Sequence, residues 1–495
     1  MKRSSGILMP IFSLPSNYGI GTLGKEAYKF VDFLYEANQK YWQILPAGPI
    51  SYGDSPYQSF SSFAGNPYFI DLDLLIEDKL LTKKEVSSID WMETEEKVDY
   101  GRIYNHRFDV LFKAYKRGIE KYRNDFEHFV SEKSKWIHEY SLFMACKRHF
   151  DMKAWSQWPE DIRLHKPEAC QKYRQLLKED VEFFEFLQFL FFKQWNQLRE
   201  YAHSKDIQII GDIPIYVALD SADVWSEPQW FLLDDQNVPI EVAGCPPDAF
   251  SEDGQYWGNP IYRYDAMQRD GYGWWIRRVD GSFQLYDVVR IDHFRGFESY
   301  WAIPYGSPTA KDGQWKKGPG MSLIGVLTSW FRGKEYIAED LGVLTDEVIQ
   351  LVKDSGLPGM KVLEFAFDSR EAADYLPHTY PRNSVCYIGT HDNLTCKQWF
   401  DEADKDDVQL AIDYLGLNKE EGYVWGMIRG GMSTVSDLFV CQMQDYLELG
   451  KEGRINLPST TGENWKWRMK KGANSKKLAK KIATYTKRYG RACHE

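Results

Sequence analysis

Residues 286–297, YDVVRIDHFRGF, place charged side chains at the end of a short apolar run. The valine and isoleucine residues of this run are typical of a buried strand. Arg290 lies within the run, and Asp292 and His293 follow at its far end. Charged groups beside a protein core are costly unless they are paired or used. The end of this strand is therefore a candidate functional site.

Similar apolar runs recur along the chain, and several of them end in polar or acidic residues. The eight candidate strands are residues 40–49, 66–73, 207–217, 285–294, 335–342, 360–367, 384–393 and 453–460. Helical patterns lie between most of them, for example at residues 23–37, 184–203 and 346–355. A strand followed by a helix about eight times is the sequence form of a (β/α)8 barrel, so we predict an α/β fold of the TIM-barrel class.

The uneven spacing of the candidate strands predicts insertions into a single barrel domain over residues 1–495. Far more residues separate the second and third candidates than one crossover helix needs. Residues 74–180 carry charged and aromatic residues at helical spacing, which predicts a helical insertion. Residues 218–280 contain several tryptophans among Gly, Pro and Asp, which predicts a loop-rich insertion over the mouth of the barrel.

The composition narrows the cellular setting and the partners. A net charge of −11 disfavours binding to nucleic acid and to anionic membranes. No apolar run approaches the length of a membrane span. The seven cysteines are scattered and form no CxxC pair, which is typical of a reducing cytosol. The N-terminus begins with basic residues, but Pro10 and Pro15 break its apolar stretch, so we expect mature protein and a cytoplasmic location.

Residues 466–491 form a locally basic C-terminal stretch. These residues can contact an anionic partner, but a solvated final helix is the simpler interpretation of such a charge run.

Four of the candidate strands deliver carboxylates to one rim of the predicted barrel. In this fold the residues at the C-terminal strand ends face the active site. Asp212, Asp292, Glu339 and Asp392 stand at such ends. Each alone is more often a helix cap or turn residue, and a lone histidine there is more often scaffold. Several like charges in one pocket are destabilising, so a fold that keeps them uses them for metal binding or acid–base chemistry.

The residue pattern favours proton transfer over metal binding. No HxH or HExxH spacing occurs, so we expect neither a metal ion nor a cofactor. Three carboxylates with flanking Arg and His suit cleavage of a glycosidic bond, with one nucleophile, one acid of raised pKa and one stabiliser of positive charge. Arg290 beside Asp292 is expected to keep that aspartate ionised, as a nucleophile requires.

The high aromatic content, 16%, fits a sugar substrate. Aromatic rings cover the apolar C–H faces of sugars while polar side chains bind the hydroxyl groups. Tyr57 lies in a loop after the first candidate strand, and Trp257 lies among acidic and glycine residues. A core position is the usual role of any single ring, but Gly- and Pro-rich loops rarely form core.

Several motifs resemble a known family. RIDHFRGF, AEDLG and GTHDN resemble the active-site strands of the α-amylase clan. The longer motifs SPYQSFSSFAGNPYFIDL, GDIPIYVALDSADVW, QYWGNPIY and GMKVLEFAF resemble glycoside hydrolase family 77, the amylomaltase or 4-α-glucanotransferase family. The resemblance covers nearly the whole chain, up to NLPSTTGENWKWR, which resembles a loop near the acceptor side.

This resemblance implies an enzyme that moves a segment of 1,4-α-glucan to the 4-hydroxyl of glucose or of a maltodextrin. Asp292 matches the nucleophile, Glu339 the general acid/base and Asp392 the transition-state stabiliser. The positions that match substrate-binding residues are Tyr57, Asp212, Trp257, Asn259, Arg290, His293 and His391. The family does not generally need calcium, and it implies a monomer or a homodimer.

The implied double displacement retains the α configuration. Retention predicts that the carboxyl groups of Asp292 and Glu339 lie roughly 5–5.5 Å apart, against about 6.5–9.5 Å for inversion. Two alternatives use the same features. A hydrolase of the clan would use water as acceptor, and a non-catalytic glucan-binding protein would keep the aromatic rings. Loops that exclude water, the longer motifs and the three carboxylates together favour transfer.

Overall fold

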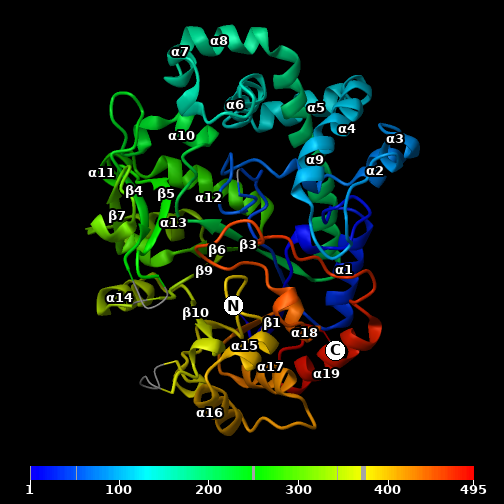
Figure 1. Cartoon of the computed structure of the whole chain (residues 1–495), viewed down its shortest axis with the longest axis vertical. Coiled ribbons are helices and arrows are strands. Elements are labelled where there is room, and N and C mark those ends of the chain that lie inside the picture. Colours follow the sequence, from blue (N-terminus) through cyan, green and yellow to red (C-terminus); the bar gives the residue numbers. More distant parts are fainter. Residues whose placement is uncertain (1, 52, 248–250, 343, 370–374, 495) are drawn as a thin grey trace.

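Eight parallel strands close into a barrel in the order β1-β12-β11-β10-β9-β6-β3-β2, which confirms the predicted (β/α)8 fold (Figure 1). The computed structural model describes residues 2–51, 53–247, 251–342, 344–369 and 375–494. The barrel strands are β1 (Ser4–Leu8), β2 (Tyr41–Gln43), β3 (Gln208–Pro214), β6 (Val288–Asp292), β9 (Glu335–Ala338), β10 (Gly359–Val362), β11 (Ser384–Tyr387) and β12 (Leu438–Gln442).

Two of the eight candidate strands were wrong, and two real strands were missed. Residues 66–73 form the 3-10 helix η2 (Pro67–Phe69) and the start of helix α2 (Leu72–Glu77), because Asn66 and Asp71 cap them. Residues 453–460 begin at the end of the 3-10 helix η9 (Lys451–Gly453) and continue without a strand. The missed strands are β1, which starts with two serines, and β12, which ends without an acidic residue.

Close packing explains the small residues on the barrel strands. Gly211 on β3 lies against the ring of Tyr286, and a Cβ atom at this position would stand only 2.1 Å from that ring. Tyr286 lies two residues before the start of β6. Strand β6 pairs with β3 from Ile210 opposite Val288 to Pro214 opposite Asp292. The glycine therefore lets the neighbouring strand pack against β3 and carry its charged end to the rim.

Amphipathic helices surround the barrel. In α1 (Lys25–Glu36) the apolar residues Ala27, Phe30, Val31 and Leu34 are buried at helical spacing. The other helices between the strands are α9 (Lys178–Ser204), α12 (Gly273–Leu285), α13 (Met321–Trp330), α14 (Asp346–Ser355), α15 (Cys396–Glu402), α16 (Lys405–Leu415), α17 (Tyr423–Ser433), α18 (Met443–Tyr446) and α19 (Lys476–Arg488). The basic C-terminal stretch contains α19, which buries Ala479 and Ile482 and presents its lysines outward.

Helices fill the long connection between β2 and β3. They are α2, α3 (Lys83–Ser87), α4 (Tyr100–Lys121), α5 (Arg123–Glu132), α6 (Ile137–His149), α7 (Glu160–Arg163), α8 (Pro167–Leu176) and α9. Phenylalanine rings of α9 pack against those of α4 and α5, for example Phe186 against Phe126 with ring centroids 5.9 Å apart. Helices α7 and α8 lie along the upper edge of the molecule in Figure 1, with α6 below them.

The connection between β3 and β6 has more regular structure than the loop-rich stretch that the sequence predicted. It contains α10 (Ala222–Ser226), β4 (Glu241–Cys245), β5 (Gln255–Pro260), α11 (Tyr264–Arg269) and α12. Strands β7 (Ser299–Pro304) and β8 (Gln314–Lys317), which follow β6, complete an antiparallel sheet of order β5-β4-β7-β8. This sheet lies beside the barrel, at the left of Figure 1.

In the part of the chain that the structure describes, no helix has both the length and the apolar character needed to cross a membrane.

Candidate active site

A buried ion cluster joins the ends of β3 and β6. Nη1 of Arg290 donates to both carboxylate oxygens of Asp212, at 2.8 and 2.6 Å, and to Oδ1 of Asp292 at 3.0 Å. The side chains of Arg290 and Asp212 are 3% and 0% exposed, whereas that of Asp292 is 27% exposed. Arg290 thus serves two carboxylates, and of the two only Asp292 is open to a substrate.

The surroundings of Asp292 act on its pKa in opposite directions. Burial raises the pKa of Asp292, and the charges of Asp212 and Asp392 raise it further, against the lowering effect of Arg290. The sequence analysis expected Arg290 to keep Asp292 ionised. Arg290 does favour the carboxylate, but burial together with the charges of Asp212 and Asp392 outweighs it, so the pKa of Asp292 lies above its ordinary value.

Glu339 follows β9 and is held by backbone groups. Its Oε2 accepts the N–H of His293 at 2.6 Å, and its Oε1 accepts the N–H of Leu341 at 3.0 Å. His293 has a φ angle of +53°, a left-handed conformation that non-glycine residues adopt mainly where the surroundings require it. Burial and the nearby charge of Asp292 raise the pKa of Glu339. This increase is larger than the increase in the pKa of Asp292. A single proton in this pair is therefore held on Glu339.

Asp392, after β11, is kept ionised by His391 and Asn456. Nε2 of His391 lies 3.2 Å from Oδ2 of Asp392, and Asn456 donates to Oδ1 at 2.6 Å. Arg454 donates to the backbone oxygen of Asp392 at 3.3 Å. Burial works to raise the pKa of Asp392, but the contacts with His391 and Asn456 outweigh it and bring the pKa to about 2. The side chain is 42% exposed, so an anionic oxygen is available at the rim.

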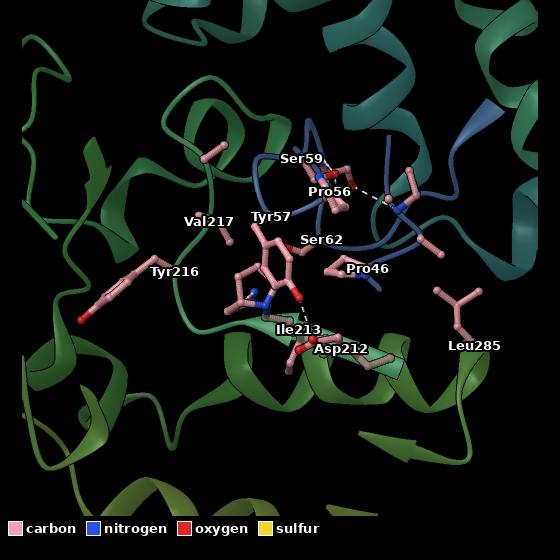
Figure 2. A pocket seen from close by; sticks show the side chains of 18 of the residues that line it. Pro46, Pro56, Tyr57, Ser59, Ser62, Asp212, Ile213, Tyr216, Val217 and Leu285 are labelled. Atoms are coloured by element: carbon pink, nitrogen blue, oxygen red, sulfur yellow. Dashed lines mark hydrogen bonds between the residues drawn. The ribbon is translucent and has the colours of Figure 1, made fainter. Parts of the chain in front are cut away.

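Tyr57 connects the two sides of the site. Its hydroxyl donates to Oδ2 of Asp212 at 2.8 Å (Figure 2), while its ring stacks on His391 with centroids 5.2 Å apart and an angle of 15°. The ring of Trp465 lies 5.8 Å from that of Tyr57. A pocket extends behind the tyrosine, between the loop that contains Pro46 and Ser59 and the end of β3. The ring is thus fixed at its hydroxyl end and on one face.

Trp257 and His293 form the opposite wall. Their rings meet edge to face, with centroids 4.8 Å apart. Burial, and the charge of Arg295, lower the pKa of His293 to about 3, so this imidazole is neutral at physiological pH. Asn259 on the same strand as Trp257 is buried; it donates to the backbone oxygen of Val217 at 2.8 Å. Neutral polar groups beside an aromatic ring are suited to sugar hydroxyls.

The residues selected from the sequence converge at one end of the barrel, but in two layers. The layer open to solvent contains Tyr57, Trp257, Asp292, His293, Glu339 and Asp392. Asp212, Asn259, Arg290 and His391 are buried beneath them and hold them in position through the contacts described above. Asp212 accepts hydrogen bonds from Arg290 and Tyr57, and its contact with the substrate stays a prediction.

Sequence reasoning missed Asn456, Arg454 and Trp465 as parts of the site. All three lie in the segment after β12, whose first part was taken for a strand. The signal available was the loop NLPSTTGENW, which contains Asn456 and Trp465. Within the described ranges, no group of three or more His, Cys, Asp or Glu side chains is arranged to hold a metal ion.

Comparisons with known proteins agree with this geometry. A family model described as 4-alpha-glucanotransferase matches residues 9–474. The chain is 51% identical over 485 residues to a 4-alpha-glucanotransferase of Clostridium butyricum, covering 98% of this chain and 100% of the relative. It is 49% identical to that of Streptococcus pneumoniae TIGR4, covering 94% and 93%.

Solved structures give the same result. The chain superposes with a TM-score of 0.97 on the amylomaltase from Streptococcus agalactiae in complex with acarbose, at 41% identity and with 99% and 100% of the two chains covered. The amylomaltase from Corynebacterium glutamicum, at 17% identity and a TM-score of 0.79, covering 98% and 75%, shares the fold. The chain therefore belongs to the 4-α-glucanotransferase family, glycoside hydrolase family 77, and is an enzyme that transfers segments of α-glucan.

Proposed function

We propose that Asp292, Glu339 and Asp392 carry out this transfer by a retaining double displacement. The observation that supports it best is the difference within the carboxyl pair: Glu339 retains a proton more strongly than Asp292. Two carboxyl groups whose surroundings separate their pKa values divide into an acid and a nucleophile. Roughly 5–5.5 Å between them remains the expected separation for retention.

In the first step the carboxylate of Asp292 attacks the anomeric carbon while Glu339 donates its proton to the glycosidic oxygen. The C–O bond breaks, the leaving glucan departs with the proton, and a glycosyl ester forms on Asp292. Positive charge develops on the sugar ring during this step. Asp392, whose pKa of about 2 keeps it anionic, stabilises that charge and binds the ring hydroxyls.

In the second step Glu339, now a carboxylate, removes a proton from the 4-hydroxyl of an acceptor sugar. The acceptor oxygen attacks the anomeric carbon and Asp292 leaves as a carboxylate. Two inversions restore the α configuration, and Glu339 is protonated again. Water can use the same path, so the outcome depends on which molecule occupies the acceptor side.

The aromatic walls favour a sugar as acceptor. Tyr57 and Trp257 offer ring faces on which glucosyl rings stack, and a stacked acceptor displaces water from the site. His293, neutral at physiological pH, and Asn456 offer polar groups to the hydroxyls. Maltodextrins and glucose are the substrates that this arrangement suits.

We also infer that residues 1–495 act as one catalytic unit, with the helices between β2 and β3 and the sheet beside the barrel as insertions. The seven free cysteines and the negative net charge support a cytoplasmic location without a nucleic-acid or membrane partner. A monomer or a homodimer is expected, and light scattering on the purified protein tests this.

Incubation with maltotriose tests the function. We expect free glucose and a ladder of longer maltodextrins, with the total number of reducing ends constant. Asp292→Asn should lose both products by orders of magnitude while it still binds glucan. Reducing ends that rise without longer products would mean that water is the acceptor, and full turnover by Asp292→Asn would remove this residue from the nucleophile role.

A further inference from the structure

Aromatic side chains form a row across the antiparallel sheet beside the barrel. Tyr256 on β5 stands opposite Gly244 on β4, Gly244 opposite Trp301 on β7, and Trp301 opposite Trp315 on β8. Residues directly opposite one another in antiparallel strands point to the same face of a sheet. The three rings therefore share one face, where the side chain of Ile303 lies over Gly244 and Trp301 packs against the buried cluster of Val242, Ile303 and Ala310.

Two rings of this row are open to solvent. Trp315 is 45% exposed and Tyr256 is 38% exposed, while Trp301 is half-buried and donates its Nε1–H to the backbone oxygen of Ala310 at 2.8 Å. A single exposed aromatic residue is ordinary on a protein surface. Exposed rings that share one face of a small sheet are unusual for a chain with a polar, negatively charged surface.

The exposed rings are held in fixed positions. The guanidinium of Arg295 lies over the ring of Trp315, with its carbon 4.1 Å from the ring centroid, and Trp301 contacts the same ring edge to face at 5.3 Å. The hydroxyl of Tyr256 accepts the N–H of Gly306 at 3.3 Å. Rings fixed before binding lose little conformational freedom when a ligand stacks on them.

The row is continuous with the catalytic site. Arg295, which supports Trp315, belongs to the same short turn as His293, which supports Trp257. This turn, η5 (Phe294–Phe297) with His293 before it, directly follows Asp292. Tyr256 and Trp257 are neighbours on β5, but their side chains diverge: Trp257 contacts His293, whereas the hydroxyl of Tyr256 contacts Gly306. The link between the catalytic site and the row therefore runs through Arg295 and Trp315. A glucan that leaves the catalytic site along this turn meets Trp315 first.

The edge strand β8 is a poor docking site for another strand. Lys316 and Lys317 follow Trp315 and pair with Glu241 and Glu298 of their own chain. Lysines on an edge strand oppose pairing with a second strand. An uncharged ligand with apolar faces is the better partner for the rings themselves, and a glucan has that chemistry.

We propose that Trp315, with Trp301 and Tyr256, forms an outer glucan-binding surface that holds glucosyl units of long α-glucans beyond the cleavage point. The inference rests on the proposed function, because it assumes that the ligand of the neighbouring site is a glucan. It deepens that function by assigning a chain-length preference to named side chains outside the carboxylate cluster.

The test compares Trp315→Ala, Trp315→Phe and Trp330→Ala with the unaltered enzyme. Trp330, at the end of α13, is 66% exposed and serves as the matched control for loss of a surface tryptophan. Two measurements are made: migration in native gels that contain amylose, and kcat/KM for amylose divided by kcat/KM for maltotriose. Thermal unfolding shows whether each variant is folded.

Trp315→Ala should migrate faster in the amylose gel and lower the kcat/KM ratio by roughly 3- to 10-fold, the effect of losing one stacked ring. Trp315→Phe, which keeps a ring, should retain most of the retardation in the amylose gel and most of the kcat/KM ratio. Trp330→Ala should match the unaltered enzyme in both measurements. Equal behaviour of the Trp315→Ala and Trp330→Ala variants would overturn the proposal. A change of oligomeric state in Trp315→Ala without a change in the ratio would reassign the row to a protein contact.

Failure of the proposed function has a different signature. If the enzyme forms no maltodextrin longer than maltotriose from that substrate, it fails as a transferase, whatever its migration in the amylose gel. The gel measurement does not depend on turnover, so the two failures are distinguishable.

Discussion

The backbone N–H of His293 donates a 2.6 Å hydrogen bond to Oε2 of Glu339. His293 directly follows Asp292, so the same turn that presents the nucleophile also holds the acid. The backbone of His293 is left-handed where it makes this bond, with φ at +53°. Such conformations are uncommon for residues with a side chain, because they cost backbone energy. They occur at functional sites, where the surrounding structure holds the residue in place. The strain thus fixes the two carboxyl groups relative to each other.

The activity should have a bell-shaped dependence on pH. Asp292 must be ionised, and its pKa is raised, so activity is lost as pH falls through a value above the ordinary ~3.9 of aspartate. Glu339 must be protonated, and its pKa is raised further, so activity is lost as pH rises through that value. The two limbs belong to the coupled pair. Initial rates with maltotriose, measured across pH, locate both limbs. A rate that does not fall on either the acid or the alkaline side of neutral pH would contradict the assignment.

Tyr57→Phe should move the acid limb to higher pH. The variant keeps the ring on His391 but removes the hydrogen bond to Asp212. The full charge of Asp212 then draws more on Arg290 and raises the pKa of Asp292. Tyr35→Phe, at an exposed ring, is the control. An acid limb identical in both variants would show that Tyr57 does not act through Asp212.

Asn456→Ala should lower kcat more than it changes KM. The variant removes the 2.6 Å hydrogen bond to Oδ1 of Asp392, one of the contacts that keep the pKa of Asp392 low. Hydrogen bonds to charged groups contribute about 1.5–3 kcal/mol, so we expect a loss of roughly 10-fold or more in kcat/KM for maltotriose. Asn383→Ala, which removes an exposed amide, is the control. A loss confined to KM would place Asn456 in ground-state binding only.

Gly211→Ala should destabilise the barrel. The new methyl group would meet the ring of Tyr286 at 2.1 Å, and overpacking of a core usually costs about 1–3 kcal/mol. Gly325, within α13, has open space around its Cα, so Gly325→Ala should instead stabilise by about 0.5–1 kcal/mol. Thermal unfolding of both variants measures the contrast. Equal midpoints would show that β3 can move away from Tyr286 without loss.

The barrel was predictable because four of its eight strands carry an apolar run with Asp or Glu near the C-terminal end. These strands are β3, β6, β9 and β11, and the pattern located the four strand ends of the active site. β1 and β12 lack that signal, since β1 begins with serines and β12 ends in Gln442. Their pairing with each other closes the barrel, which is a long-range property that local patterns do not encode.

The candidate site was predictable in its composition and less so in its layers. The motifs brought the correct residue types together, but burial decides which of them a substrate can reach. Asp212 and Arg290 are charged and lie beside Asp292 in the barrel, yet they are almost fully buried. Asn456 was out of reach of strand-end reasoning, because a loop that follows a missed strand carries it to Asp392.

The central claim is that Asp292 forms a covalent bond to the sugar, and the most direct test is to trap that bond. In Glu339→Gln, α-maltosyl fluoride can still glycosylate Asp292, because fluoride leaves without a proton donor, but the acceptor is no longer activated. We predict that the maltosyl enzyme accumulates and that mass spectrometry of its peptides finds the added sugar on Asp292. A sugar adduct on another residue, or rapid fluoride release in Glu339→Gln with no adduct at all, would contradict this account.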